Sequence, residues 1–313
     1  MKARIVAVDS FVPHPIGLGV GHIIADGEYT SDLAVMAART LFVSHNIDPA
    51  TVDYLILCTQ SPDYFLPTTA CVVQAQIGLR LDVGAVDITL GHSGFIYALG
   101  LAKGLIESGQ VRNVLVITAE THSKFANPGD KSARPIVSDG AAATLVVADP
   151  MHDGLTGLTL GTDGDGRMGL VEPIGGLRGA EEFSPNSSVE APGLRSDDHD
   201  RHMDGQEIFD VTIRVVRGCV DEVLRKAALT MSDVDLFVLH QANGYVTEHL
   251  RKMLEIPTEK YLVSMEEYGN IGAATIPIAL TNAIAAGRIK KEDKIMLVGF
   301  GVGLSWGGVL VTW

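Results

Sequence analysis

Two parts of this chain carry the same kind of predicted strand, far apart in the sequence. Residues 52–60 and 234–243 both begin with Val-Asp and continue as a short apolar run, which is typical of a buried strand. Cys58 in the first run and His240 in the second are 182 residues apart. A repeat at this distance constrains the fold strongly, because it predicts two similar halves.

The elements that follow extend the repeat. A Gly-flanked turn at 91–94 has a counterpart at 269–272, displaced by 178 residues. The paired elements after the turns are a helix (98–108 and 273–286), a glycine that stops it (Gly109 and Gly287), a strand (114–117 and 295–298) and a closing strand (142–147 and 308–312). Strands that alternate with helices indicate α/β layers. The ordered offsets favour an internally duplicated α/β fold over a chance similarity of strand–helix units.

The segment between the two halves has a different composition. Residues 161–204 are rich in Gly, Pro, Asp and Ser, which is typical of loops and not of a core. The run at 161–166 lacks the ligand spacing and the closing Glu of a calcium loop. We predict an N-terminal half at 1–160, a loop-rich crossover or cap at 161–204 and a C-terminal half at 205–313.

The composition excludes several classes of protein. The chain has 313 residues, 46% of them hydrophobic, but no apolar run that would cross a bilayer and no secretory leader pattern. A net charge of -14 and an aromatic content of 6% disfavour nucleic-acid binding. Three cysteines without paired or metal-type spacing indicate a reducing compartment and no zinc site. We expect a cytoplasmic protein that binds no membrane, nucleic acid or metal.

His92 stands in the first Gly-flanked turn, between an apolar strand and a helix. A helix N-terminus presents unpaired N–H groups and the positive end of the helix dipole, and enzymes commonly place a nucleophile there. The same dipole disfavours a charged histidine, so we expect His92 to be neutral at neutral pH. A neutral imidazole serves most often as a general base.

Four motifs jointly resemble the beta-ketoacyl-ACP synthase III family of the thiolase superfamily. They are GHSGF at 91–95, HQAN at 240–243, GNIGAATIP at 269–277 and GFGVGLSWGGVLV at 299–311. The resemblance covers nearly the whole chain and implies the thiolase fold, which is internally duplicated, layered α/β/α/β/α and built on two mostly parallel mixed sheets. It also implies an acyltransferase of the condensing type in fatty acid or polyketide biosynthesis or secondary metabolism. No cofactor is implied beyond a substrate thioester of CoA or acyl carrier protein.

The resemblance assigns roles to three residues. In the family, a Cys in the turn accepts an acyl group, and a His and an Asn polarise the carbonyl of a malonyl thioester. His240 and Asn270 match that His and Asn, and their N–H groups can stabilise an enolate oxygen. The nucleophile position, in contrast, holds His92. Cys58 is the only thiol expected near the site, and we interpret it first as a small buried packing residue.

Further site residues are implied by the resemblance alone. Val302 and Gly303 belong to the turn that forms the family's oxyanion hole, with Val302 in place of a glycine. Lys131 falls near a position that contacts CoA phosphates. Leu66 matches a position that reaches across a dimer interface to line the acyl pocket, so a homodimer is implied. The family's clamp for the CoA adenine has no counterpart at 13–30, which favours carrier-bound or small-molecule thioesters.

Several hypotheses for function stay open. Without a Cys at residue 92 we expect no acyl-enzyme, so the pocket either transfers acyl groups non-covalently with His92 as a base or decarboxylates a malonyl thioester. Alternatively, the chain is a catalytically inactive partner subunit that forms a heterodimer with an active synthase. It could also be an engineered form of an ordinary 3-oxoacyl-ACP synthase III in which His92 replaces the natural Cys. Retention of both His240 and Asn270 favours an enzyme.

Overall fold

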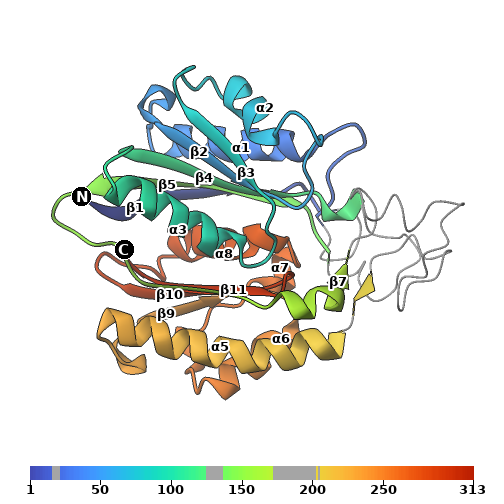
Figure 1. Ribbon diagram of the computed structural model, residues 1–313, viewed down its shortest axis with the longest axis vertical. Coiled ribbons are helices and arrows are strands. Elements are labelled where there is room, and N and C mark those ends of the chain that lie inside the picture. The colour runs from blue at the N-terminus through green and yellow to red at the C-terminus, as the bar shows by residue number, and fades with distance from the viewer. Residues whose placement is uncertain (16–21, 125–136, 172–201, 204) are drawn as a thin grey trace, which may run out of the picture.

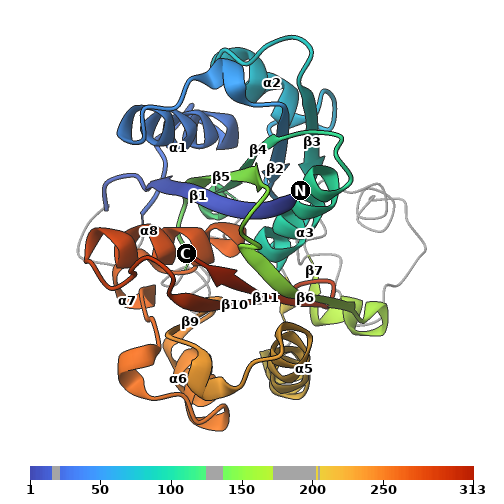
Figure 2. The same cartoon turned by 90° about the vertical axis from the view of Figure 1, so that its left-hand side faces the viewer.

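The molecule is built of five layers, in which helices and sheets alternate as α/β/α/β/α (Figure 1). The computed structural model describes residues 1–313 except 16–21, 125–136, 172–201 and 204. The helices are α1 (Thr30–Ser44), α2 (Thr69–Gln76), α3 (Gly94–Glu107), α5 (Gly205–Ala227), α6 (Gly244–Met253), α7 (Met265–Tyr268) and α8 (Thr275–Ala285). Helices α1 and α2 cover the first sheet, α5 and α6 cover the second, and α3 and α8 lie between the two sheets (Figures 1 and 2).

The first sheet has five strands in the order β1–β5–β4–β2–β3. Their bounds are Lys2–Phe11 for β1, Tyr54–Cys58 for β2, Gly84–Ile88 for β3, Asn113–Glu120 for β4 and Gly140–Asp149 for β5. Strand β2 pairs parallel with β3 and β4, whereas β5 pairs antiparallel with β4 and with β1. Strand β5 is therefore the single reversed strand of this sheet.

The second sheet repeats this order as β6–β11–β10–β9. Its strands are β6 (Leu155–Thr162), β9 (Leu236–Leu239), β10 (Lys294–Gly301) and β11 (Ser305–Thr312). Strand β10 pairs parallel with β9, and β11 pairs antiparallel with β10 and β6. Beside β9, an isolated parallel bridge between Phe237 and Tyr261 takes the place that β3 has beside β2. Two mixed sheets, each with one reversed strand, confirm the predicted fold class.

The strand pairing favours a different position for one predicted domain boundary. The sequence places residues 1–160 in the N-terminal half, but β6 begins at Leu155 and pairs with β11, so it is an edge strand of the second sheet. The pairing joins residues about 150 positions apart in the chain, which local pattern does not reveal. We propose a boundary between β5 and β6.

The predicted crossover at 161–204 lies largely outside the described residues. The structure describes a 3₁₀ turn (Gly164–Gly169) and the short antiparallel pair of β7 (Leu170–Val171) and β8 (His202–Met203). Among the helices that the structure describes, none is long and apolar enough to span a membrane.

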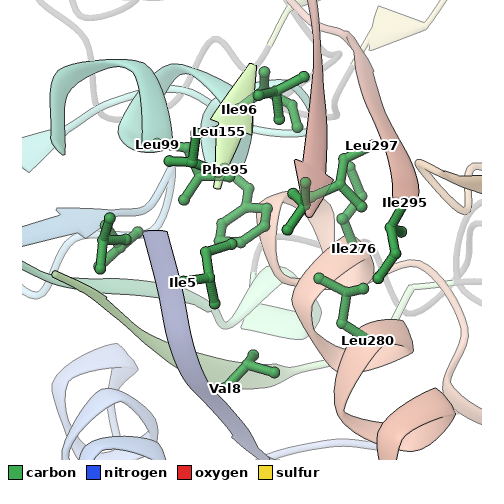
Figure 3. Close-up of a cluster of buried hydrophobic side chains, with 14 of the residues drawn as sticks. Ile5, Val8, Phe95, Ile96, Leu99, Leu155, Ile276, Leu280, Ile295 and Leu297 are labelled. Atoms are coloured by element: carbon green, nitrogen blue, oxygen red, sulfur yellow. The ribbon is translucent and has the colours of Figure 1, made fainter. Parts of the chain in front are cut away.

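The largest apolar core lies between the two sheets and surrounds α3 and α8 (Figure 3). Phe95 and Ile96 of α3 and Ile276 of α8 are fully buried there. Because both helices have sheets on two sides, they are apolar over most of their surface, as buried helices are. The predicted stop residues Gly109 and Gly287 follow them with positive φ of 79° and 67°, the conformation that glycine adopts at helix ends.

Replacement of Phe95 by alanine tests this central core. The ring is 0% exposed, so Phe95→Ala removes buried apolar contacts and leaves a cavity, and we expect the free energy of unfolding to fall by about 3–5 kcal/mol. Urea denaturation followed by circular dichroism measures this. Val43 on α1 is 82% exposed, so Val43→Ala should change stability by only about 0.5 kcal/mol. Similar small effects for both variants would contradict the assignment of the core.

Candidate active site

His92 lies in the turn between β3 and α3, directly before the N-cap residue Ser93. Ser93 Oγ and Ser305 Oγ form a buried hydrogen bond of 2.6 Å, which joins this turn to the β10–β11 turn. A Cβ atom on Gly301 would lie only 2.7 Å from Cγ and Nδ1 of His92, and the φ of Gly301 is +155°. Only glycine fits at 301. The imidazole of His92 is therefore packed between a helix N-terminus and a hairpin turn.

His240 follows β9 and is 1% exposed. Its backbone N–H donates to the carbonyl of Val298 at 2.8 Å, which extends the pairing of β9 with β10. Its ring centroid lies 4.6 Å from that of His92 in an edge-to-face arrangement, and 5.4 Å from that of Phe300. The structure thus brings together two histidines that are 148 residues apart in the sequence.

The surroundings of His240 favour its neutral form. Burial lowers the pKa of His240 well below its usual value of 6.5, and the neighbouring His92 and His122 lower it further. A neutral imidazole has one N–H donor and one acceptor nitrogen. His240 can therefore donate a hydrogen bond to a substrate oxygen without carrying a charge.

Asn270 lies in the turn that precedes α8, and two hydrogen bonds orient its amide. Its Oδ1 accepts from the backbone N–H of Gly272 at 3.0 Å, and its Nδ2 donates to the carbonyl of Ala242 at 3.2 Å. Ala242 lies two residues after His240, so the second bond ties the two predicted donors together. Among the described residues, one N–H of the Asn270 amide is used in this way, and the other can donate to a ligand.

The remaining residues of the motif at 240–243 shape the loop. Gln241 is fully buried, and its amide donates to the carbonyl of Leu239 at 2.7 Å and accepts from the N–H of Ser264 at 3.1 Å. Asn243 caps α6 by accepting from the N–H of Val246 at 2.9 Å. These contacts hold the loop on which His240 sits.

Two of the three cysteines have surroundings unsuited to nucleophilic catalysis, and the third lies on the surface of α2. Cys58 is fully buried, its thiol donates to the carbonyl of Leu90 at 2.9 Å, and burial together with Glu120 raises its pKa well above 9.0. Burial also raises the pKa of Cys219 to about 12. Cys71 is exposed on α2, where its Sγ lies 3.1 Å from Thr68 Oγ1. The interpretation of Cys58 as a packing residue is consistent with this environment.

A buried Glu120–His122 pair beneath the Asn270 turn was missed by the sequence analysis. Glu120 Oε2 accepts from the N–H of Gln60 at 3.0 Å and lies 3.2 Å from His122 Nε2. A Cβ atom on Gly272 would lie 2.8 Å from His122 Cε1, so the pair packs directly against the turn. The signal in the sequence is a carboxylate at the end of the apolar run 114–119, because buried acidic residues are rare unless paired.

The remaining candidate residues do not all lie near His92. Val302 and Gly303 lie in the β10–β11 turn, next to Gly301 and hence near His92, and the carbonyl of Val302 accepts from Ser305 Oγ at 2.7 Å. Leu66 is 85% exposed at a loop before α2. Lys131 lies outside the described residues. Within the described ranges, no cluster of three or more His, Cys, Asp or Glu side chains could hold a metal ion.

Two family models match the chain. The model of 3-oxoacyl-[acyl-carrier-protein] synthase III matches residues 86–164, and the model of its C-terminal part matches residues 224–313. The matched residues include His92, His240 and Asn270.

Individual relatives extend the similarity over the whole chain. A beta-ketoacyl-[acyl-carrier-protein] synthase III of Caldanaerobacter subterraneus subsp. tengcongensis is 38% identical over 97% of this chain and 89% of its own. A crystal structure of a 3-oxoacyl-(acyl-carrier-protein) synthase III superposes with a TM-score of 0.93 at 37% identity, covering all of both chains. The Thermus thermophilus enzyme superposes with a TM-score of 0.88 at 32% identity, over 99% of each chain.

The burial of His240 predicts a pH-dependent stability. Because its pKa is lower in the folded than in the unfolded chain, the unfolded chain binds the proton first on acidification. The contribution of neutral His240 to the free energy of unfolding is fully present above about pH 6.5. It is lost as the pH falls toward the folded pKa, by at most about 1.4 kcal/mol per pH unit. Urea denaturation at about pH 7.5 and about pH 5.5 should show a smaller loss for His240→Gln than for the wild type. Equal losses in the two proteins would contradict the shift.

Proposed function

The chain belongs to the 3-oxoacyl-[acyl-carrier-protein] synthase III family, and on that premise we propose that it decarboxylates a malonyl-type thioester without forming an acyl-enzyme at residue 92. The family is one of condensing enzymes with the thiolase fold. The proposed reaction includes the decarboxylation of the malonyl thioester, which needs hydrogen-bond donors. It does not include acylation of the enzyme, which needs a thiol.

The observation that carries the proposal is the contact between the rings of His92 and His240, with centroids 4.6 Å apart. An imidazole thus lies beside His240, in the turn where the family has its Cys. Cys58 is buried behind this turn, since a Cβ atom on Gly94 would clash with its Sγ. Its raised pKa keeps it a thiol. An acyl-imidazole at His92 would hydrolyse readily, so a stored acyl group is not expected there.

The proposed reaction uses His240 and Asn270 as the oxyanion donors. The N–H groups of the two side chains bind the thioester carbonyl oxygen of the malonyl group. The bond between the α-carbon and the carboxylate breaks and CO₂ leaves. The electron pair of that bond stays with the α-carbon and forms an enolate, whose oxygen these donors stabilise. The α-carbon then takes a proton from solvent, which gives CO₂ and the acetyl thioester. Because no acyl group is bound covalently at residue 92, the enolate has no carbon electrophile to attack.

A second candidate is acyl transfer to a hydroxyl or amine acceptor. His92 is half-buried and stands at the N-terminus of α3, a position that favours neutral imidazole and hence a general base. In this reaction the base takes the acceptor's proton while the acceptor attacks the thioester carbonyl, and the thiol leaves. Addition of hydroxyl and amine acceptors to the assay distinguishes the two reactions.

Incubation of the protein with a malonyl thioester tests the proposal. We expect CO₂ and acetyl thioester to form, with no mass added to the protein, and His240→Ala to lower the rate roughly 100- to 1,000-fold through loss of one oxyanion donor. Mass spectrometry of the intact protein and of the products measures both.

His92→Cys is the matched control. This variant restores a thiol at the helix N-terminus, so it should gain an acyl adduct from an acyl thioester and form a condensation product with a malonyl thioester. If the wild type releases no CO₂ and transfers no acyl group, and His240→Ala changes nothing even with a partner synthase present, the enzyme proposal fails. An acyl adduct on wild-type His92 would also overturn it.

We also propose a homodimer that buries the segment 64–66. Tyr64, Phe65 and Leu66 are 59%, 78% and 85% exposed, and consecutive large apolar side chains at this exposure favour a protein interface. Sedimentation should give twice the chain mass of 33.3 kDa. Phe65→Asp should shift the protein to monomers, because a charge replaces a buried ring. Val43→Asp, at a site 82% exposed on α1, should leave the dimer intact. A wild-type mass of one chain would contradict the proposal.

A further inference from the structure

The hydrogen bonds around His240 bear on which ring nitrogen carries its proton. His240 Nδ1 lies 2.7 Å from Thr275 Oγ1, and both side chains are at least 97% buried. A hydroxyl can donate to this nitrogen or accept from it. If Thr275 donates, the proton of the neutral imidazole is on Nε2. If Thr275 accepts, the proton is on Nδ1 and Nε2 is an acceptor.

The carbonyl of Gly272 is the competing acceptor for the Thr275 hydroxyl, at 3.1 Å. That carbonyl already accepts from the backbone N–H of Thr275, at the end of the 3₁₀ turn 272–274. It therefore does not depend on the hydroxyl. The distance to His240 is the shorter of the two, 2.7 Å against 3.1 Å. These observations direct the hydroxyl proton to His240.

We propose that Thr275 is a positioning residue that donates its hydroxyl proton to Nδ1 of His240 and so keeps the imidazole proton on Nε2. His240 then faces the substrate as a hydrogen-bond donor and not as a base. Its low pKa keeps the ring from taking a second proton. Any base work in the site would fall to another group.

The same residue, Gly272, also holds the second donor. The N–H of Gly272 donates to Asn270 Oδ1 at 3.0 Å, which points the amide N–H₂ away from that bond, while the carbonyl of Gly272 accepts from the backbone N–H of Thr275. The Gly272 residue thus sets Asn270 on one side and supports Thr275 and His240 on the other. Both oxyanion donors are therefore oriented through one short turn.

The catalytic consequence rests on the proposed function, but the tautomer can be measured without it. Long-range proton–nitrogen NMR spectra of protein labelled with ¹⁵N-histidine distinguish a protonated from an unprotonated ring nitrogen, and His240→Gln identifies the signals of His240 among the ten histidines. We expect the wild type to show a protonated Nε2 and a hydrogen-bonded, unprotonated Nδ1 near neutral pH. Thr275→Ser should give the same spectrum.

Thr275→Val removes the hydroxyl at nearly constant volume. We expect the Nδ1 signal to lose its hydrogen-bond shift and the second tautomer to appear. The kcat of decarboxylation should fall roughly 10- to 100-fold, as for a misoriented donor, with KM changed by less than about 3-fold. Thr275→Ser should keep kcat within about 3-fold of the wild type.

Thr144→Val is the matched control for buried threonines. Thr144 is fully buried in β5, and its hydroxyl has no hydrogen-bond partner among the described residues. This variant should leave the His240 signals and kcat unchanged. A protonated Nδ1 in the wild type, or a Thr275→Val spectrum identical to the wild type, would overturn the inference, and the first result needs no variant that folds. If no protein decarboxylates while the wild-type tautomer is as expected, only the proposed function fails.

Discussion

The burial of α3 and α8 between the two sheets is the constraint on which the rest of the structure depends. Both helices are apolar over most of their surface, so most of that surface must be covered, and a sheet lies on each side of the pair. Their N-terminal ends meet, since a Cβ atom on Gly94 would lie 3.6 Å from the Cβ of Ala273. The turns that carry His92 and Asn270 therefore come to one place. The site is a consequence of packing these two helices side by side (Figure 2).

Much of this arrangement can be predicted from the sequence, because the signals are local. Apolar runs, glycine stops and Gly-flanked turns predict the order of elements in both halves, and the repeat predicts that the two halves are similar. The edge strand β6 could not be placed, because its partner β11 lies far along the chain. The contact of Thr275 with His240 was missed for the same reason, because it joins side chains of distant elements and no spacing rule reports it. The Glu120–His122 pair is local in the chain, but its packing against Gly272 also depends on a distant element.

The electrostatics of the site favour uncharged groups. His240 is buried against aromatic and apolar neighbours, and its low pKa follows from the cost of placing a charge there. Such surroundings strengthen the hydrogen bonds that neutral donors offer to an anionic oxygen. The same burial keeps Cys58 protonated. The buried environment thus strengthens the hydrogen bonds of the donors and keeps the Cys58 thiol protonated and unreactive.

The buried bond between Ser93 and Ser305 also bears on how the protein is made. It joins residues that are 212 positions apart, and Gly301 packs on His92 across a similar separation. During synthesis, the ribosome completes the first half long before the hairpin of β10 and β11 exists. Until that hairpin docks, the turn at residue 92 lacks its contacts with Gly301 and Ser305. All strands of the first sheet lie within residues 2–149, but the turn at residue 92 gains these contacts only after nearly the whole chain has emerged.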